Sequence, residues 1–251
     1  MKLRLDQLLV ERGLAETRSK AQALLLAGQV RVGSGDQARR DRKAGDLVDR
    51  AVSVELVARP RYVSRGGDKL AAALDAFAID PAGRVCLDVG ASTGGFTDVL
   101  LQRGAARIYA LDVGRGQLAE SLRRNARVVS MERTHAGRLD PSHEERLTLP
   151  EPVSLAVIDV SFISLTRILR GVQAQLLPGG EIVALVKPQF EAGREAVAKG
   201  VVRDPAVRRA AVDSVRAHAQ GLGLRVAGEI ESPLLGPAGN HEFLVHLVSG
   251  A

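Results

Sequence analysis

The sequence predicts an α/β protein in which a small N-terminal α+β domain precedes a larger domain built on a parallel sheet. Three observations support this prediction. The chain of 251 residues is 45% hydrophobic and 25% charged, as folded proteins of one or two domains are. Its excess of basic residues lies entirely in the first 66 residues, and strand-like apolar runs alternate with helical patterns only beyond them.

The first 60 residues predict two helices followed by short strands. Leu5, Leu8 and Leu9 occupy one face of a short helix that ends at Gly13. Thr17 can cap a second helix, which Gly28 ends before the strand-like QVRV. Turn signals at 33–35 and 44–46 then indicate a small β region.

The positive charge is concentrated in this N-terminal segment. Residues 1–66 contain 14 Lys and Arg against 8 Asp and Glu, whereas the rest of the chain contains 21 of each. A short basic segment favours a polyanionic partner, because each cation near a phosphate releases condensed counterions. Nucleic acid is the leading candidate, and a solvated basic surface without a ligand is the alternative.

One pattern in this segment resembles a known RNA-binding domain. Arg4, Asp6, the leucines and Gly13, then SKA at 19–21 and GQVRVG at 28–33, resemble the αL domain shared by pseudouridine synthases, tyrosyl-tRNA synthetases and a small-subunit ribosomal protein. The resemblance covers residues 1–60 and implies that Arg4, Arg18, Lys20 and Arg31 bind structured RNA. Many relatives carry arginine at position 20. The lysine keeps the positive charge but lacks the planar guanidinium group that binds phosphate through two hydrogen bonds.

A linker is expected between the two domains. In VARPRYVSRGG, at 57–67, Pro60 interrupts any strand and Gly66-Gly67 interrupts any helix. We therefore expect domains at 1–60 and 68–251, with an interdomain linker at 61–67.

The larger domain alternates strands with helices. The strand-like runs are at 84–90, 107–114, 127–131, 153–160 and 181–188, and the helical patterns are at 96–104, 165–177 and 205–223. Strands rich in Val, Ile and Leu on both faces predict a parallel sheet covered by helices on both sides.

A glycine-rich turn follows the first of these strands, in DVGASTGGFT at 88–97. Such a turn lets the backbone approach a ligand closely. It is not a P-loop, and Ser92 departs from G-x-G-x-x-G. Asp112, 22 residues after Gly90, ends the next strand, where an acidic residue can accept hydrogen bonds from ribose hydroxyls. The alternative is a tight turn capped by Ser92 or Thr93.

Asp88 is an acidic residue directly before the glycine turn. In this respect the turn resembles the first motif of S-adenosylmethionine-dependent methyltransferases more than the glycine turn of a dehydrogenase. The resemblance implies S-adenosyl-L-methionine as the cofactor. The residues it implies in cofactor binding are Asp88, Gly90, Ser92, Thr93, Gly94, Gly95, Phe96 and Asp112.

Four ionisable residues lie at the ends of expected elements: Lys69, Asp159, Lys187 and Glu242. Open parallel sheets bind ligands beyond the carboxyl ends of their strands, where Asp159 and Lys187 lie. We expect all four to point into one crevice and to be the catalytic residues. Exposed surface charge is the alternative for each of them.

The Lys-Asp-Lys-Glu order resembles the tetrad of the FtsJ-like ribose 2′-O-methyltransferases, together with DVGASTGGFTDVLL, DVSFISL, LVKPQFE, KGVVRD and GNHEFL. Combined with an αL domain, it resembles the TlyA family of rRNA cytidine 2′-O-methyltransferases, also called haemolysin A. The resemblance implies a Rossmann-like fold, S-adenosylmethionine-dependent methylation of cytidine ribose, and ribosomal RNA within ribosomal subunits as the partner. One departure is Thr134-His135, where relatives usually carry Thr-Asn.

The chemistry accounts for these residue types. A ribose 2′-hydroxyl is a poor nucleophile, so a base must remove its proton as the oxygen approaches the methyl group in line. Lys187 is the candidate base because a second ammonium, Lys69, weakens its hold on a proton. Asp159 and Glu242 would orient the lysines. The loop at 191–204, with glycines at 193 and 200, is expected to be a mobile substrate loop.

Other classes are disfavoured. The single cysteine, Cys86, forbids intrachain disulfides and suits a reducing cytoplasm, and the five histidines show no metal-ligand spacing. The N-terminus lacks the apolar run of a signal peptide, and no apolar run approaches the ~20 residues of a membrane span. We expect a cytoplasmic monomer without a metal. Two alternatives remain: a non-catalytic RNA-binding or ribosome-assembly factor, and a pore-forming lysin.

Overall fold

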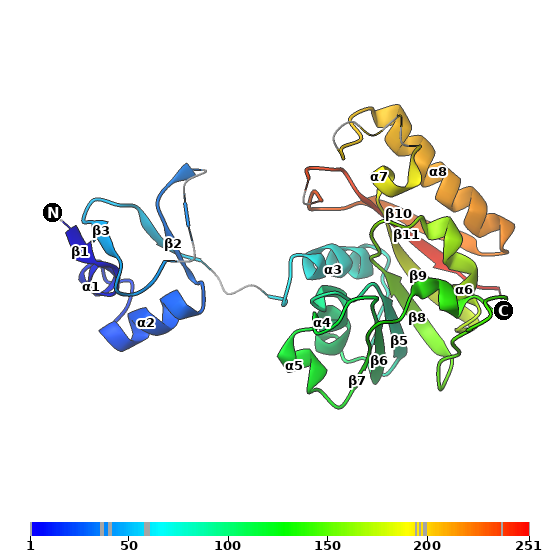
Figure 1. The fold of residues 1–251 in the computed structure, drawn as a ribbon, viewed down its shortest axis with the longest axis horizontal. Helices are drawn as coiled ribbons and strands as arrows, with labels where there is room; N and C mark the ends of the chain where they lie inside the picture. The colour runs from blue at the N-terminus through cyan, green and yellow to red at the C-terminus, as the bar shows by residue number, and fades with distance from the viewer. Residues whose placement is uncertain are drawn as a thin grey trace. The chain divides into compact units, whose positions relative to one another are not determined.

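The chain divides into two compact units, Met1–Pro60 and Arg61–Ala251. A computed structural model describes residues 2–35, 38–39, 42–57, 61–193, 195, 197, 200–236 and 238–250 (Figure 1). Each unit has its own hydrophobic core. The α/β fold class predicted from the sequence is confirmed.

The N-terminal unit packs two helices against two small antiparallel strand pairs. Its elements are β1 (Lys2–Arg4), α1 (Leu5–Glu11), α2 (Arg18–Leu26), β2 (Val30–Val32), β3 (Leu47–Asp49) and β4 (Val54–Leu56). Strand β1 pairs with β3, and β2 pairs with β4. Thr17 caps α2, because its Oγ1 accepts the N–H of Lys20 at 3.2 Å. The leucines at 5, 8 and 9 are fully buried in the core between these elements.

Residues 61–67, which we expected to form a linker, belong instead to the larger unit. Tyr62 is buried in its core, and α3 (Gly66–Ala76) begins at the glycine pair. A Cβ on Gly67 would lie 2.5 Å from the Tyr62 side chain, so the glycine is needed for close packing. The pair therefore begins a helix where we expected it to prevent one.

The larger unit is built on a sheet that, in the described part of the chain, has seven strands in the order β10-β11-β9-β8-β5-β6-β7. The strands are β5 (Val85–Val89), β6 (Arg107–Leu111), β7 (Val128–Met131), β8 (Val153–Ile158), β9 (Leu176–Val186), β10 (Arg225–Glu231) and β11 (Phe243–Val248). The first five are parallel, as expected. Strands β10 and β11 run antiparallel at one side and were not predicted, so the sheet is mixed.

Helices cover both faces of this sheet (Figure 1). One face packs against α3, α4 (Gly95–Gln102) and α5 (Glu120–Arg123), and the other packs against α6 (Leu169–Gln173) and α8 (Pro205–Gly221). Neighbouring residues of β5 alternate between the two cores: Cys86 lies in the first, and Leu87 in the second. The sheet is thus the buried central layer.

The helix expected at 165–177 is shorter than predicted. The segment forms a 3-10 turn at Leu165–Arg167, then α6, and β9 begins already at Leu176. Buried Gln175 explains the early end, because its side chain accepts the N–H of Leu149 at 3.0 Å and donates to the carbonyl of Leu139 at 3.3 Å. These contacts fix the chain where it turns into the strand.

The order of the strands determines where a ligand can bind. Strands β5 and β8 are neighbours, and the chain proceeds outward from them in opposite directions across the sheet. Ligands of open α/β sheets bind at the carboxyl ends of the strands at such a switch point. Gly90 follows β5 there, and Asp159 follows β8.

Candidate active site

The turn after β5 requires glycine for two physical reasons. Gly90 has φ +87°, in the left-handed region, and a Cβ there would lie 2.5 Å from the carbonyl oxygen of Asp159. Gly94 has φ +96°, and its Cβ would meet the side chains of Leu122 and Leu118. The glycines therefore bring the turn against the neighbouring loop and against the α5 region.

Asp88 lies directly behind this turn and is fully buried. Its Oδ2 accepts a hydrogen bond from Thr97 Oγ1 at 2.6 Å, and its Oδ1 has no hydrogen-bond partner among the described residues. Burial raises the pKa of Asp88 to about 7, and the nearby carboxylate of Asp159 adds to the effect. An unpaired buried acceptor of this kind is costly unless a ligand or water completes it.

Asp112 connects two turns at the carboxyl edge of the sheet. Its Oδ2 accepts the N–H of Ser92 at 2.8 Å, and its Oδ1 accepts the N–H of Gly114 at 2.6 Å. Each carboxylate oxygen has a second lone pair, so these bonds leave capacity for a ligand hydroxyl. Asp112 thus lies beside the glycine turn, as expected from the sequence.

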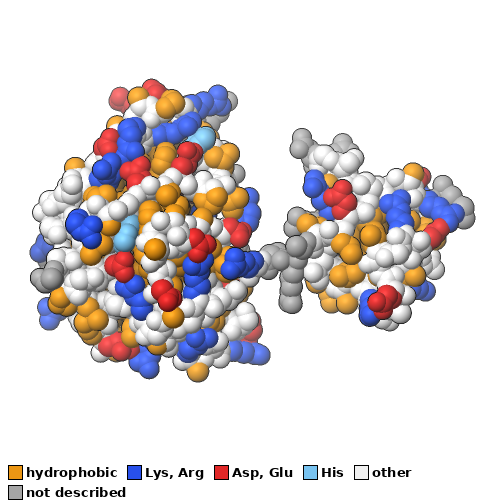
Figure 2. All heavy atoms as spheres, turned by 180° about the vertical axis from the view of Figure 1, so that it is seen from behind, with side chains coloured by type: hydrophobic (Ala, Val, Ile, Leu, Met, Phe, Trp, Pro, Cys, Tyr) orange, Lys and Arg blue, Asp and Glu red, His pale blue; other side chains and the backbone are white. Residues whose placement is uncertain are grey.

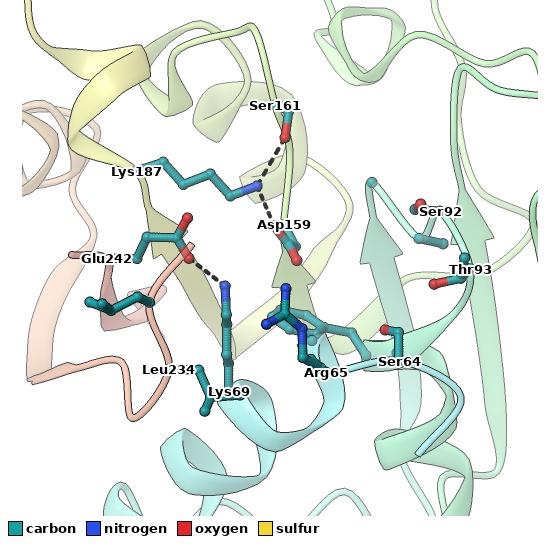
Figure 3. A pocket seen from close by; sticks show the side chains of 16 residues that line it. Ser64, Arg65, Lys69, Ser92, Thr93, Asp159, Ser161, Lys187, Leu234 and Glu242 are labelled. Carbon is teal, nitrogen blue, oxygen red and sulfur yellow. Dashed lines mark hydrogen bonds and ion pairs between the residues drawn. The ribbon is translucent and has the colours of Figure 1, made fainter. Parts of the chain in front are cut away.

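The four residues of the expected catalytic tetrad meet in one place (Figure 3). Lys69, on α3, forms a buried ion pair with Glu242, just before β11. Lys187, just after β9, lies 2.6 Å from Asp159 Oδ1. We expected Asp159 and Glu242 to orient the two lysines, and in the structure each lysine has its own carboxylate. Pairing of this kind offsets the cost of burying both charges.

The charges of the site do not balance. Glu242 Oε1 is buried and has no hydrogen-bond partner within the described residues, whereas Asp159 Oδ1 contacts Lys187 Nζ. Arg65 lines the same site, and its side chain has no ion pair with any described residue. Since both lysines are paired with carboxylates, the site has one uncompensated positive charge, which suits an anionic phosphate.

Two adjoining cavities lie at this edge of the sheet. The first, of about 300 Å³, contains the tetrad and is lined further by Ser64, Arg65, Gly66, Gly90, Ala91, Ser92, Thr93, Gly95, Phe96, Ser161, Leu234 and Leu235. The second, of about 490 Å³, is lined by residues that include Asp112, His135 and Phe162. They share Gly90, Ser92, Asp159 and Ser161. Asp88 and Gly94 lie behind the cavities and line neither.

These features fit S-adenosylmethionine. The glycine turn lines the first cavity with its backbone, buried Asp88 supports this turn from behind, and Asp112 lines the second cavity. An elongated ligand with a nucleoside at one end and an amino acid at the other suits two joined cavities.

Sequence reasoning missed Arg65 and Ser161 as lining residues. Arg65 was overlooked because the neighbouring glycines were interpreted as a linker. Ser161 follows β8 by three residues, so the rule that selected Asp159 could also have selected it. Leu234 and Leu235 carry no comparable signal, because their loop gains its position only through the unpredicted β10 and β11.

The candidate RNA-binding residues of the N-terminal unit are only partly brought together. Arg4 and Arg18 both bind the fully buried carboxylate of Asp6, at 3.0 and 3.1 Å. Lys20 pairs instead with Glu16, and Arg31 donates to the carbonyl of Gly35 at 3.4 Å. On the larger unit, basic side chains lie among acidic ones over the face shown in Figure 2. This agrees with the balanced charge of its sequence.

The expected mobile loop at 191–204 is anchored at both ends. Glu191, the last residue of α7 (Pro188–Glu191), accepts the N–H of Leu165 at 2.9 Å. Asn240 accepts the N–H of Val202 at 2.9 Å and donates to the carbonyl of Gly200 at 2.8 Å. Residues 194, 196, 198 and 199 lie outside the described residues. Hydrogen bonds thus hold both ends of the loop, and its mobility stays a prediction.

The fold and site define a class of protein. A Rossmann-like sheet with a glycine turn after one strand and an acidic residue after the next is the cofactor site of an S-adenosylmethionine-dependent methyltransferase. The sequence profile of the FtsJ-like methyltransferase family matches residues 62–249, and the S4 domain profile matches residues 3–33. The chain belongs to the FtsJ-like methyltransferase family, in the TlyA group that carries an N-terminal S4 domain.

Individual relatives support this membership over nearly the whole chain. YqxC of Bacillus subtilis is 48% identical over 248 residues, covering 98% of this chain and 85% of that protein. The 16S/23S rRNA (cytidine-2′-O)-methyltransferase TlyA of Mycobacterium tuberculosis is 46% identical, covering 97% and 89%. A solved structure from Streptococcus thermophilus is 44% identical with a TM-score of 0.74, covering 99% and 89%.

Proposed function

We propose that this methyltransferase transfers a methyl group from S-adenosylmethionine to the ribose 2′-oxygen of cytidine in ribosomal RNA. The observation that carries the proposal is the convergence of two lysine–carboxylate pairs, Lys69–Glu242 and Lys187–Asp159, beside the glycine turn. A relative 46% identical bears the name of an rRNA cytidine-2′-O-methyltransferase. Methylation of a neutral hydroxyl needs a base that removes its proton and hydrogen-bond acceptors that orient it. The lysines and carboxylates of the two pairs supply both.

The glycine turn and the two acidic residues near it would hold the cofactor. Bound S-adenosylmethionine supplies a methyl group on a positively charged sulfur, whose carbon–sulfur bond breaks onto sulfur as the new carbon–oxygen bond forms. Gly90 lines both cavities, so the backbone of the turn lies where the cofactor would bind. Asp112 then accepts from ribose hydroxyls of the cofactor, and Asp88 holds the turn from behind.

The tetrad prepares the target hydroxyl. Lys187 in its neutral amine form takes the proton of the 2′-hydroxyl at Nζ, and Asp159 stabilises the ammonium that results. Lys69 is held by Glu242, and both line the cavity in which the target ribose would lie. Arg65 binds the phosphate next to that ribose, because it is the lining cation without a partner among the described residues. Holding the oxygen in line supplies much of the acceleration.

Recognition of the RNA is divided between the units. In the N-terminal unit, Asp6 holds the guanidinium groups of Arg4 and Arg18 in place, so their remaining N–H donors are oriented toward phosphate. Near the active site, the exposed ring of Phe162 offers a surface on which one base can stack. Ribosomal RNA as the substrate places the proposed reaction in the cytoplasm.

Two other functions are less well supported. A non-catalytic RNA-binding or assembly factor would not require the unsatisfied acceptors and paired lysines of the site. A pore-forming lysin has no positive observation in its favour; none of the described helices is both long and apolar enough to cross a membrane.

The test uses ribosomal subunits from a strain that lacks the enzyme. The purified protein is incubated with methyl-labelled S-adenosylmethionine and each subunit, and the label is mapped to a nucleotide and atom. We expect label on a cytidine 2′-oxygen, and loss of transfer in Lys187→Ala with cofactor affinity unchanged by calorimetry. Wild-type protein that binds cofactor but labels neither subunit contradicts the proposal and favours the assembly factor.

A further inference from the structure

Ser161 stands directly against the candidate base. It follows β8 by three residues, and Lys187 follows the neighbouring parallel strand β9 by one, so the two side chains extend from adjacent loops into the same cavity. Lys187 Nζ donates a hydrogen bond to Ser161 Oγ at 3.0 Å (Figure 3). Neither the family's tetrad nor the proposed mechanism so far uses this hydroxyl.

The two partners of Lys187 act on its nitrogen in different ways. Asp159 Oδ1 lies 2.6 Å from Nζ and stabilises its charge. Ser161 Oγ is the neutral partner, which accepts an N–H of Nζ at 3.0 Å. A hydrogen bond fixes the direction of an N–H. The rotation of the amine about the Cε–Nζ bond is thus determined by the serine together with the aspartate.

Direction matters because a base acts through its lone pair. A neutral amine has tetrahedral geometry: one bond to carbon, two N–H bonds and one lone pair. When Ser161 holds one N–H and the Asp159 charge attracts the other, the lone pair faces the remaining direction, into the cavity. A second carboxylate in place of the serine would favour the charged ammonium, whereas a neutral hydroxyl accepts from the amine and the ammonium alike.

We propose that Ser161 is a positioning residue that aims the lone pair of Lys187 at the target hydroxyl. This inference rests on the proposed function, since it assumes that Lys187 is the base. The proton leaves the hydroxyl oxygen, is bound by the lone pair of Nζ, and later passes to water. Ser161 gains and loses no proton in this sequence, and it keeps its hydrogen bond to Nζ throughout.

The test compares Ser161→Ala, which removes the hydroxyl, with Ser161→Thr, which retains it. Ser214→Ala is the control, because Ser214 is exposed on α8, away from both cavities. Methyl transfer to the labelled subunit is measured to give kcat and KM, and cofactor affinity is measured by calorimetry. We expect Ser161→Ala to lower kcat about tenfold without changing KM or cofactor affinity, as removal of a positioning contact does. Ser161→Thr should retain most of the activity.

A Lys187→Ala background separates the possible causes when its slow residual transfer is followed over a long incubation with excess enzyme. If Ser161 acts through the lysine, Ser161→Ala lowers this residual rate no further. An unchanged kcat in Ser161→Ala, or a raised KM alone, overturns the inference and in the second case assigns the hydroxyl to RNA contact. Active wild-type protein in those experiments leaves the proposed function intact. An inactive wild type overturns both.

Discussion

Thr97 donates a hydrogen bond to the buried carboxylate of Asp88 at 2.6 Å, yet the other oxygen of that carboxylate has no partner among the described residues. The fold thus keeps one hydrogen-bonding position unsatisfied directly behind the cofactor turn. A buried polar group that lacks a partner lowers the stability of the free protein. The binding site is therefore maintained at some expense to the fold around it.

This arrangement makes stability depend on pH. Burial raises the pKa of Asp88 to about 7, whereas an unfolded aspartate titrates near ~3.9. Between these values the folded state holds a proton that the unfolded state has lost, so rising pH removes stability across this window. We expect Asp88→Asn to lose this dependence and to be more stable than the wild type at pH 8, because the amide stays neutral and can still accept from Thr97.

Denaturant unfolding at several pH values checks the prediction. The difference in unfolding free energy between Asp88→Asn and wild type should grow from pH 4 to pH 7 and then level off. A difference that is constant with pH would show that Asp88 is not the titrating group.

The N-terminal unit shows the opposite dependence. The side chain of Arg4, followed by those of Gln22 and Arg18, holds the pKa of Asp6 well below its usual range despite the burial of the carboxylate. A lowered pKa gives stability that is present above the unfolded value and is lost as pH falls below it. Asp6→Asn should therefore destabilise this unit at pH 7 by about 1–3 kcal/mol, the contribution of hydrogen bonds to a charged group.

Hydrogen exchange of α1 and α2 amides reports on this unit separately. The difference between Asp6→Asn and wild type should shrink below pH 4. RNA affinity should also fall, because Arg4 and Arg18 lose their shared anchor. Intact affinity together with reduced stability would restrict Asp6 to a structural role.

The glycine turn allows the effects of backbone conformation and crowding to be separated. Gly90 and Gly223 have nearly equal φ values, +87° and +82°, but a Cβ on Gly90 would collide with the Asp159 carbonyl, whereas a Cβ on Gly223 would meet nothing within 4 Å. Gly223→Ala should lower the free energy of unfolding only by the strain of a left-handed alanine, about 1–2 kcal/mol. Gly90→Ala should lower the free energy of unfolding clearly more and should also weaken cofactor binding.

Thermal melts and calorimetry with S-adenosylmethionine distinguish these effects. Equal losses of stability in the two variants would mean that the loop containing Asp159 moves aside easily. In that case the close approach of the turn to this loop would not determine the shape of the site.

The sequence allowed the site to be predicted better than the surrounding elements. Asp159 and Lys187 were identified because residues at the carboxyl ends of neighbouring parallel strands must lie close together, whatever the details of the helices. The two lysine–carboxylate pairs come from four segments of the chain, and which carboxylate pairs with which lysine depends on side-chain packing, which periodicity does not report. The helix of Lys69 was expected to begin after the glycine pair, because local propensity disfavours glycine, whereas packing against Tyr62 demands it and the helix begins at Gly66. Strands β10 and β11 were not predicted because neither is a continuous apolar run: glutamates interrupt β10, and a histidine interrupts β11.

The last prediction concerns Phe162. Its backbone conformation favours glycine, whereas its proposed role in base stacking requires the aromatic side chain. It has φ +65°, a strained conformation for a residue with a side chain, and its ring is 91% exposed beside Phe190. Neither feature benefits the folding of the free protein, and strain of this kind collects at functional sites. We expect Phe162→Gly to leave stability within about 1 kcal/mol of wild type, since relief of strain offsets the entropy of the added glycine. The same variant should raise KM for the ribosomal subunit, because the stacking surface is gone. Phe162→Leu, which keeps apolar bulk without the ring, should raise KM as well, and a wild-type KM in this variant would assign the contact to hydrophobic burial instead of base stacking.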